Sequence, residues 1–286
     1  MLKEEVKQIM NRNKFVSKVL KIAVYGSAII TFSALLLLIG YILVKGIPHL
    51  KPSLFALEYN SENVSLFPAL INTFTMTGLS LIVAVPIGIG SAIYLVEYAK
   101  RGNKVVGIIR LTTETLSGIP SIVYGLFGML FFVTALGWRL SILAGAMTLA
   151  IMILPLIMRT TEEALQSVPD SFREGSFGLG AGRLRTVIRI VLPAATPGIL
   201  SGIILAVGRI VGETAALIYT AGTLAEVPST VMDSGRTLAV HMYALSNEGL
   251  YTDQAYATAV VLLVIVLLIN WLSGALAKRI GRNAIN

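Results

Sequence analysis

The sequence predicts an all-α membrane protein with six transmembrane helices and both termini in the cytoplasm. Of its 286 residues, 55% are hydrophobic and 13% are charged, a composition too apolar for a soluble domain of this size. A spanning helix needs about 20 predominantly apolar residues. Six stretches without Asp, Glu, Lys or Arg meet or nearly meet that length: 22–44, 69–96, 115–138, 140–158, 190–208 and 255–277.

Basic residues set the expected orientation, because cytoplasmic flanks collect Lys and Arg. If the chain starts inside, 18 of its 23 Lys and Arg residues fall on the cytoplasmic side, and the remaining 5 fall outside: Lys45, Lys51, Arg139, Arg209 and Arg236. The net charge of +8 is therefore mostly a signal of topology. Dispersed basic residues argue against a nucleic-acid-binding protein, and the absence of Cys excludes disulfides and thiol catalysis.

The N-terminal part is expected to be separate from the transport core. Residues 1–21 are basic and predict a helix on the inner membrane surface, attracted by anionic lipids. The apolar stretch 22–44 is longer than a signal-peptide core and predicts a retained anchor. A proline-containing outer loop follows. We therefore expect residues 1–68 to hold the cytoplasmic segment, the first helix and this loop, and residues 69–286 to form a five-helix core.

Hydroxyl and helix-breaking residues mark the second and third spans. Thr73 and Thr77 share one helical face, which indicates ordinary helix packing, with a pathway-lining role for Thr73, Thr77 or Ser80 as the alternative. In the third span, Pro120 removes an intrahelical hydrogen bond, so freed backbone groups must face protein or water. Such breaks often line transport paths, which makes Ser121 and Tyr124 candidate pathway residues.

The long charged loop between the fourth and fifth spans carries the most specific pattern in the chain. It reads E-x5-G-x9-I-x-L-P, with Glu174, Gly180, Ile190, Leu192 and Pro193 at the fixed positions. Chance would place these five residues in a chain this long roughly once in ten thousand tries. A capping box from Ser171 to Glu174 would explain the carboxylate alone, but it leaves the spacing unexplained.

An arginine and a glutamate end the fifth span. Arg209 and Glu213 are four residues apart and are expected on one helix face. Arg209 lies about 24 Å along the helix from Pro193, inside an apolar core of about 30 Å. Ionisable residues at such depths usually pair and face a pathway, whereas a snorkelling arginine is the alternative. His241 is isolated in the outer region and indicates a structural role.

The E-x5-G-x9-I-x-L-P pattern resembles the cytoplasmic EAA loop of ABC importer permeases, and Gly175 and Ser176 replace the alanines that usually follow its glutamate. Four further runs resemble the phosphate branch of that family, the PstA type: G-I-P-S-I-V-Y-G-L, R-T-T-E-E-A-L, R-x-x-G-E-T and A-V-H-M-Y-A-L-S-N-E-G. The resemblance extends over the whole chain and implies the type I, MetI-like importer fold.

The resemblance also implies roles and partners. Coupling to an ATPase falls to the loop 159–193, through Glu174, Gly175, Ser176, Gly180, Ile190, Leu192 and Pro193. The substrate pathway is expected to include Arg209, Glu213, Thr214, Ser121, Tyr124 and Thr77. The implied partners are a sister permease of the PstC type, ATPase subunits of the PstB type and an external phosphate-binding protein of the PstS type. The chain lacks G-x-x-x-x-G-K-[ST], so the partner ATPase is expected to bind ATP and magnesium, and no cofactor is expected here.

Three other interpretations remain. A permease for another oxyanion, such as sulfate, molybdate or phosphonate, would share the EAA loop. An ion-coupled secondary transporter would not need that loop. An intramembrane hydrolase would need Ser and His aligned within the membrane, but both histidines fall in outer loops and no G-x-S-x-G elbow is present.

Overall fold

The computed structural model describes residues 2–100 and 102–283, with side chains described at 14, 16–100, 102–272 and 274–275. Within these residues the secondary structure is entirely helical. In chain order the elements are α1 (Leu2–Gly46), η1 (Ile47–His49), η2 (Pro52–Phe55), α2 (Phe67–Ile93), η3 (Tyr94–Tyr98), α3 (Lys104–Ser117), α4 (Ser121–Gly128), η4 (Met129–Ala135), α5 (Ile142–Gln166), α6 (Asp170–Gly178), α7 (Arg183–Thr186), η5 (Val187–Val191), α8 (Leu192–Val211), α9 (Ala215–Thr220), α10 (Leu238–Glu248) and α11 (Thr252–Asn283).

Five helical segments of the described chain are long and apolar enough to cross a membrane: Val16–His49, Phe67–Tyr98, Ile142–Gln166, Arg183–Val211 and Thr252–Leu272. A sixth crossing is a bent pair, Lys104–Ser117 and Ser121–Ala135, whose axes differ by 102°. The six predicted spans are confirmed if this pair counts as one span. The break expected at Pro120 in the third span is confirmed, because Gly118 caps α3 and Pro120 cannot donate the next helical hydrogen bond. The first half of this pair begins at Lys104, earlier than the expected start at residue 115.

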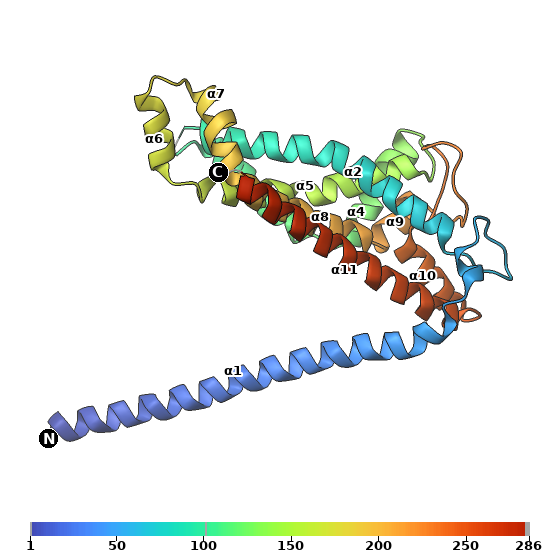
Figure 1. Ribbon diagram of the computed structural model, residues 1–286, viewed down its shortest axis with the longest axis horizontal. Coiled ribbons are helices and arrows are strands. Elements are labelled where there is room, and N and C mark those ends of the chain that lie inside the picture. The colour runs from blue at the N-terminus through green and yellow to red at the C-terminus, as the bar shows by residue number, and fades with distance from the viewer. Residues whose placement is uncertain (1, 101, 284–286) are drawn as a thin grey trace.

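Helix α1 diverges from the rest of the molecule (Figure 1). It meets α11 near its own C-terminal end, where Gly46 is buried and a Cβ there would lie 2.4 Å from the Tyr256 carbonyl oxygen. The rings of Tyr41 and Tyr256 also meet edge to face at 5.8 Å. The expected separate surface helix over 1–21 is wrong, because α1 runs unbroken from this segment into the first span.

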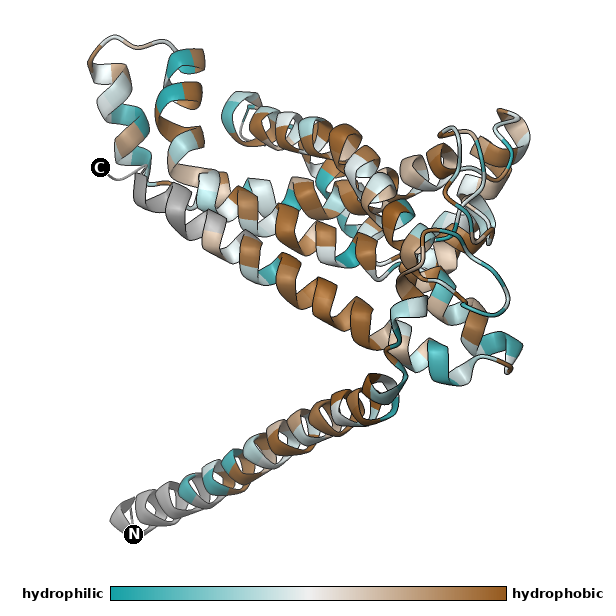
Figure 2. Cartoon of the chain, turned by 45° about the vertical axis from the view of Figure 1, so that its right-hand side comes forward, coloured by the Kyte–Doolittle hydropathy of each residue, from teal (hydrophilic) through white to brown (hydrophobic). Residues whose placement is uncertain are grey.

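The core forms where α2, α5 and α8 pack together. Its fully buried side chains include Met76, Leu149, Ile153 and Ile157. Glycine allows α5 and α8 to approach each other closely, because a Cβ at Gly202 of α8 would lie 2.0 Å from the Thr160 hydroxyl of α5. Apolar residues dominate the middle of the long helices, while polar residues gather toward the two ends of the bundle (Figure 2). This distribution is the one that a bilayer selects.

The two ends of the bundle differ. The coupling end contains η3, the start of α3, α6 and α7, and the distal end contains residues 47–66 and 221–251. The first residues of α1 and the last described turn of α11 both lie toward the coupling end (Figure 1). That arrangement agrees with termini on one side of a membrane, and their cytoplasmic location stays a prediction. The division into 1–68 and 69–286 also stays a prediction.

Candidate functional site

The E-x5-G-x9-I-x-L-P segment forms a protruding pair of short helices. Helix α6 leads through a turn at Gly180 into α7, and both project from the coupling end of the bundle (Figure 1). Gly180 has a φ of +80°, a backbone conformation that L side chains rarely adopt. Its glycine is therefore required by the turn and not by crowding, because a Cβ there would meet no atom within 4 Å.

The protruding segment exposes a largely apolar surface. Glu174 and Gly175 are exposed, and so are several large apolar side chains: Phe172, Phe177, Leu179, Leu184, Ile188 and Ile190. Ser176 points inward instead, where its hydroxyl lies 2.8 Å from the Thr186 hydroxyl and ties α6 to α7. Leu192 and Pro193 are half-buried and start α8. Exposed apolar surface of this kind marks protein interaction sites.

The alternative explanation of Glu174, a capping box with Ser171, is not supported. Helix α6 begins at Asp170 after Pro169, and no side chain caps its first turn, so Ser171 is already inside the helix. Proline presets a suitable backbone angle for entry, which removes the need for a serine cap. Glu174 is consequently free of this structural role, and its carboxylate lies on the exposed surface.

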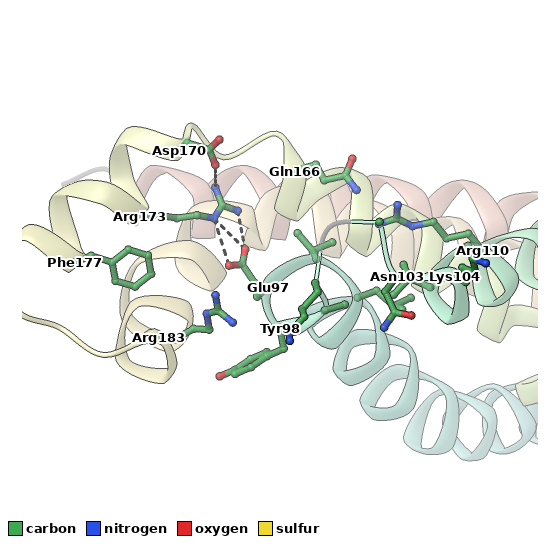
Figure 3. Close-up of a pocket in the computed structure, with 17 residues that line it drawn as sticks. Glu97, Tyr98, Asn103, Lys104, Arg110, Gln166, Asp170, Arg173, Phe177 and Arg183 are labelled. Atoms are coloured by element: carbon green, nitrogen blue, oxygen red, sulfur yellow. Dashed lines mark hydrogen bonds and ion pairs between the residues drawn. The ribbon is translucent and has the colours of Figure 1, made fainter.

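Arg173 joins the protruding segment to the membrane helices (Figure 3). Its Nη2 lies 2.7 Å from Glu97 Oε1 at the end of the second span. The same nitrogen also donates to the Leu165 carbonyl, and Nη1 donates to the Val168 carbonyl. Only 14% of the arginine side chain and 8% of the glutamate side chain are exposed. Sequence reasoning missed this pair. A lone carboxylate ending an apolar span was the available signal, but nothing local identified a partner 76 residues away.

The break in the third span lies against the segment that follows Thr214. Tyr124 is buried and donates a hydrogen bond to the Leu116 carbonyl, which bridges the break between α3 and α4. A Cβ at Gly125 would lie 2.8 Å from Ala216 Cα, so α4 and α9 touch through backbone. Ser121, half-buried, is the first residue of α4. The structure thus brings two separately predicted motifs together.

A cavity of about 630 Å³ lies beside this junction. Thr214 lines it, together with Ile122, the neighbour of Ser121. The other walls come from α1, α9, α10 and α11, with mostly apolar side chains: Ile42, Ile218, Tyr219, Met242, Tyr243 and Tyr256. Thr77 is not brought to this cavity. Its side chain is buried and donates to the Thr73 carbonyl, in agreement with the packing role that was the main expectation.

Arg209 and Glu213 do not share a helix face, so that expectation is wrong. Helix α8 ends at Val211 with Gly212 as its C-cap, and Glu213 lies beyond it. Glu213 is 9% exposed, and its Oε1 accepts a hydrogen bond from the Ala216 amide at 3.2 Å, which supports the start of α9. Arg209 stays half-buried in the last turn of α8 and forms no ion pair within the described residues.

A second buried cation lies at the distal end. The Arg236 side chain is 4% exposed, its guanidinium lies 5.0 Å from the centre of the Tyr59 ring, and its Nε and Nη2 find no partner within the described residues. His241 is fully buried and meets the same ring edge-on. Burial, and then the charge of Arg236, lower the pKa of His241 to about 3, against the opposing effect of the Val64 backbone. A neutral, packed His241 fits the expected structural role.

These features define a multi-pass membrane protein with a broken helix and a protruding pair of short helices between two spans, the architecture of a permease. The chain belongs to the family described as binding-protein-dependent transport system inner membrane component, which matches residues 84–282. It is therefore a permease component of a bacterial ABC import system, and this family is not a catalytic one.

Curated relatives extend over most of the chain. The probable ABC transporter permease protein YqgI of Bacillus subtilis is 32% identical, over 95% of this chain and 100% of the relative. The phosphate transport system permease protein PstA of Haemophilus influenzae is 33% identical, over 86% of this chain and 88% of the relative. The phosphate transport system permease protein PstA 1 of Mycobacterium tuberculosis strain H37Rv is 40% identical, over 55% of this chain and 50% of the relative.

Solved structures support the predicted fold. The MetNI methionine ABC transporter in an inward-facing conformation is similar with a TM-score of 0.58 at 20% identity, covering 75% of this chain and 94% of that one. A bacterial ABC transporter involved in the import of alginate is similar with a TM-score of 0.54 at 18% identity, covering 87% of this chain and 95% of that one. The predicted MetI-like permease fold is confirmed.

Proposed function

We propose that the chain is the permease subunit of an ATP-driven phosphate importer. The observation that carries this proposal is the similarity to a phosphate transport permease over 88% of that relative's length. The coupling segment supports an ATP-driven mechanism, because an exposed Glu174 beside exposed apolar side chains offers a docking surface for a separate subunit. ATP and magnesium then belong to that ATPase, of the PstB type.

The surface of α1 supports a sister permease as the second partner. Large apolar side chains along this helix are exposed, among them Ile22, Ile30 and Leu37 at 71–74%. A bilayer covers part of such a surface, and a helix that leaves its own bundle is suited to pack on another one. We assign this role to a PstC-type subunit, with an external PstS-type protein delivering phosphate to the distal end.

Arg209 is the residue that we expect to meet phosphate. A guanidinium presents paired donors to oxyanion oxygens and stays charged when partly dehydrated. A lone arginine within a span costs about 2.5 to 3.5 kcal/mol at mid-bilayer, so an unpaired Arg209 is better explained by an anionic substrate than by packing. Glu213 lies four residues on, and its carboxylate can accept the proton that monohydrogen phosphate donates and sulfate lacks.

Three of the remaining pathway residues lie near the junction between the broken span and α9. Thr214 lines the cavity beside it, and Ser121 and Tyr124 lie on α4, which contributes Ile122 to the lining. Thr77 is the weakest member of the set, because its hydroxyl is already satisfied inside α2.

Uptake by the assembled importer in vesicles tests this proposal. Arg209→Gln is expected to abolish phosphate uptake with the complex assembled, Arg209→Lys to be poorer than wild type, and Glu213→Gln to be impaired to a different extent. Arg139→Gln, an exposed arginine elsewhere, is the matched control and should keep normal uptake. If the Arg209→Gln variant takes up phosphate at the wild-type rate, Arg209 is a snorkelling residue and not a substrate ligand. Sulfate uptake equal to phosphate uptake would favour a permease for another oxyanion.

A further inference from the structure

A polar cavity of about 890 Å³ lies at the coupling end, separate from the junction near Thr214. It opens between η3, the start of α3, and the helices α6 and α7 (Figure 3). Its polar walls include Tyr98, Asn103, Lys104, Arg110, Arg173 and Arg183. Neither the coupling role of Glu174 nor the proposed pathway uses this space.

The cavity carries an excess of positive charge. Its two acidic lining residues, Glu97 and Asp170, are both engaged by Arg173, at 2.7 and 3.3 Å. Arg110 is paired with Glu162 at 2.9 Å. Of the other basic lining residues, Lys100, Lys104 and Arg183 form no ion pair within the described part of the chain.

Lys104 and Arg183 approach the cavity from different elements. Arg183 begins α7, and its guanidinium lies 5.8 Å from the centre of the Tyr98 ring, which orients it toward the cavity side of η3. Lys104 is the first residue of α3, where the side chain of Asn103 accepts a hydrogen bond from the Val105 amide. The positive end of the α3 dipole therefore adds to the charge of both side chains.

Helix α3 adds an apolar surface beside this charge. Val105, Ile108 and Leu111 recur every three residues and are 59%, 63% and 65% exposed. An amphipathic helix with apolar side chains on one face and basic residues near its end is typical of contact with the membrane interface. An anionic group held in the cavity can thus be continuous with acyl chains along α3.

We propose that this cavity binds the phosphate-bearing headgroup of an anionic phospholipid, with Lys104 and Arg183 as its charged ligands. A free phosphate ion presents the same oxygens to the same donors, and the apolar stripe on α3 is what favours the lipid. The proposal does not depend on which substrate the permease carries. Bound lipid would link the coupling segment to the membrane surface next to the end of the second span.

A fluorophore placed in the cavity tests the proposal on the full chain. The chain has no Cys, so Gly107→Cys gives a single labelling site. Gly107 lines the cavity, and a Cβ there meets no atom within 4 Å. The labelled chain is reconstituted in phosphatidylcholine vesicles, and then in vesicles with increasing phosphatidylglycerol. We expect an emission shift that saturates with phosphatidylglycerol.

Charge variants then distinguish a specific headgroup site from general electrostatic attraction between basic residues and the anionic vesicle surface. Lys104→Gln with Arg183→Gln should lose most of the shift at the phosphatidylglycerol content that gives the parent chain half of its full shift, since two cations that attract the anionic headgroup are removed. Arg185→Gln with Arg189→Gln is the matched control, because both residues are exposed at the same end and neither lines the cavity. This control should respond like the parent chain.

The outcomes assign the occupant. A shift with phosphatidylglycerol that is lost in the Lys104 and Arg183 variant alone supports the lipid site. If inorganic phosphate in phosphatidylcholine vesicles instead produces a shift that is lost only in the Lys104 and Arg183 variant, the cavity is an anion site whose ligand is free phosphate. That result would overturn the lipid proposal. The absence of a shift with either probe, or equal loss in both charge variants, overturns the proposal.

Discussion

The guanidinium of Arg173 lies 2.7 Å from the carboxylate of Glu97 and ties the protruding helix α6 to the end of the second span. Both side chains are largely buried, and Arg173 also donates to the carbonyl of Leu165 in the last turn of α5 and to that of Val168 in the turn that precedes α6. A force applied to α6 by a docked subunit would therefore reach α2 and α5 through one side chain. We therefore expect Arg173, next in sequence to the exposed Glu174, to act as a positioning residue in coupling.

Breaking this pair should destabilise the coupling end. Removing one partner of a buried ion pair typically costs about 3–5 kcal/mol, because the other charge stays buried. Arg173→Gln and Glu97→Gln are each expected to lower the thermal unfolding midpoint of the purified chain. The double variant should lose less than the sum of the two. Strict additivity in this double-mutant cycle would show that the two side chains do not interact.

The turn at Gly180 should tolerate no side chain. Its φ of +80° makes even alanine cost about 1–2 kcal/mol, so Gly180→Ala should misplace α7 and weaken copurification with the ATPase. The matched control is Gly175→Ala in the same segment, which has open space, lies inside α6 and should favour the helix. Equal ATPase recovery from the two variants would contradict the docking role of this turn.

Gly125 should be required where the broken span meets α9. A methyl group there would lie 2.8 Å from Ala216 Cα, and backbone cannot move aside as a flexible side chain can. Gly125→Ala is expected to cost about 1–3 kcal/mol through overpacking and to slow uptake. Gly78→Ala in α2, where nothing lies within 4 Å, serves as the control. An unchanged unfolding midpoint in Gly125→Ala would mean that α4 and α9 separate easily.

Acid should destabilise the distal end through His241. Its pKa is about 3 in the folded chain and near 6.5 when unfolded, so the unfolded state binds the proton more tightly. The stability contribution of His241 is therefore complete above pH 6.5 and is lost progressively as the pH falls toward 3.

Thermal unfolding between pH 7 and 4 measures this effect. His241→Phe keeps a ring beside Tyr59 but removes the titration, so its unfolding midpoint should fall less steeply with acid than that of the parent. A parental slope in His241→Phe would place the acid sensitivity elsewhere.

The distribution of basic residues predicts which end faces the cytoplasm. A membrane-impermeant thiol reagent applied to intact cells should label Asn60→Cys and leave Asn283→Cys unlabelled, on an otherwise cysteine-free chain. Permeabilised cells, in which both positions react, provide the control. Labelling of position 283 from outside would reverse the predicted topology.

Much of the architecture was readable from local sequence. The uncharged stretch 69–96 located the span 67–98 to within two residues at each end, and the stretches 140–158 and 255–277 overlap most of the spans 142–166 and 252–272. Such stretches are informative because partition into a bilayer depends on consecutive side chains. The pattern from Glu174 to Pro193 located the protruding segment for the same reason, since its residues are close in the chain. Pro120 signalled the break in the third span, but the direction and size of the bend were not encoded locally.

The sequence by itself determined the fold class, the approximate positions of most spans and the family resemblance, because each depends on residue type and short-range spacing. Tertiary structure alone decided that Arg209 and Glu213 are not on one helix, that Gly125 meets Ala216, and that Arg173 reaches Glu97 from a position 76 residues away. Such relationships require the relative placement of several helices. That placement is fixed by packing across the whole bundle, which no single stretch of residues specifies.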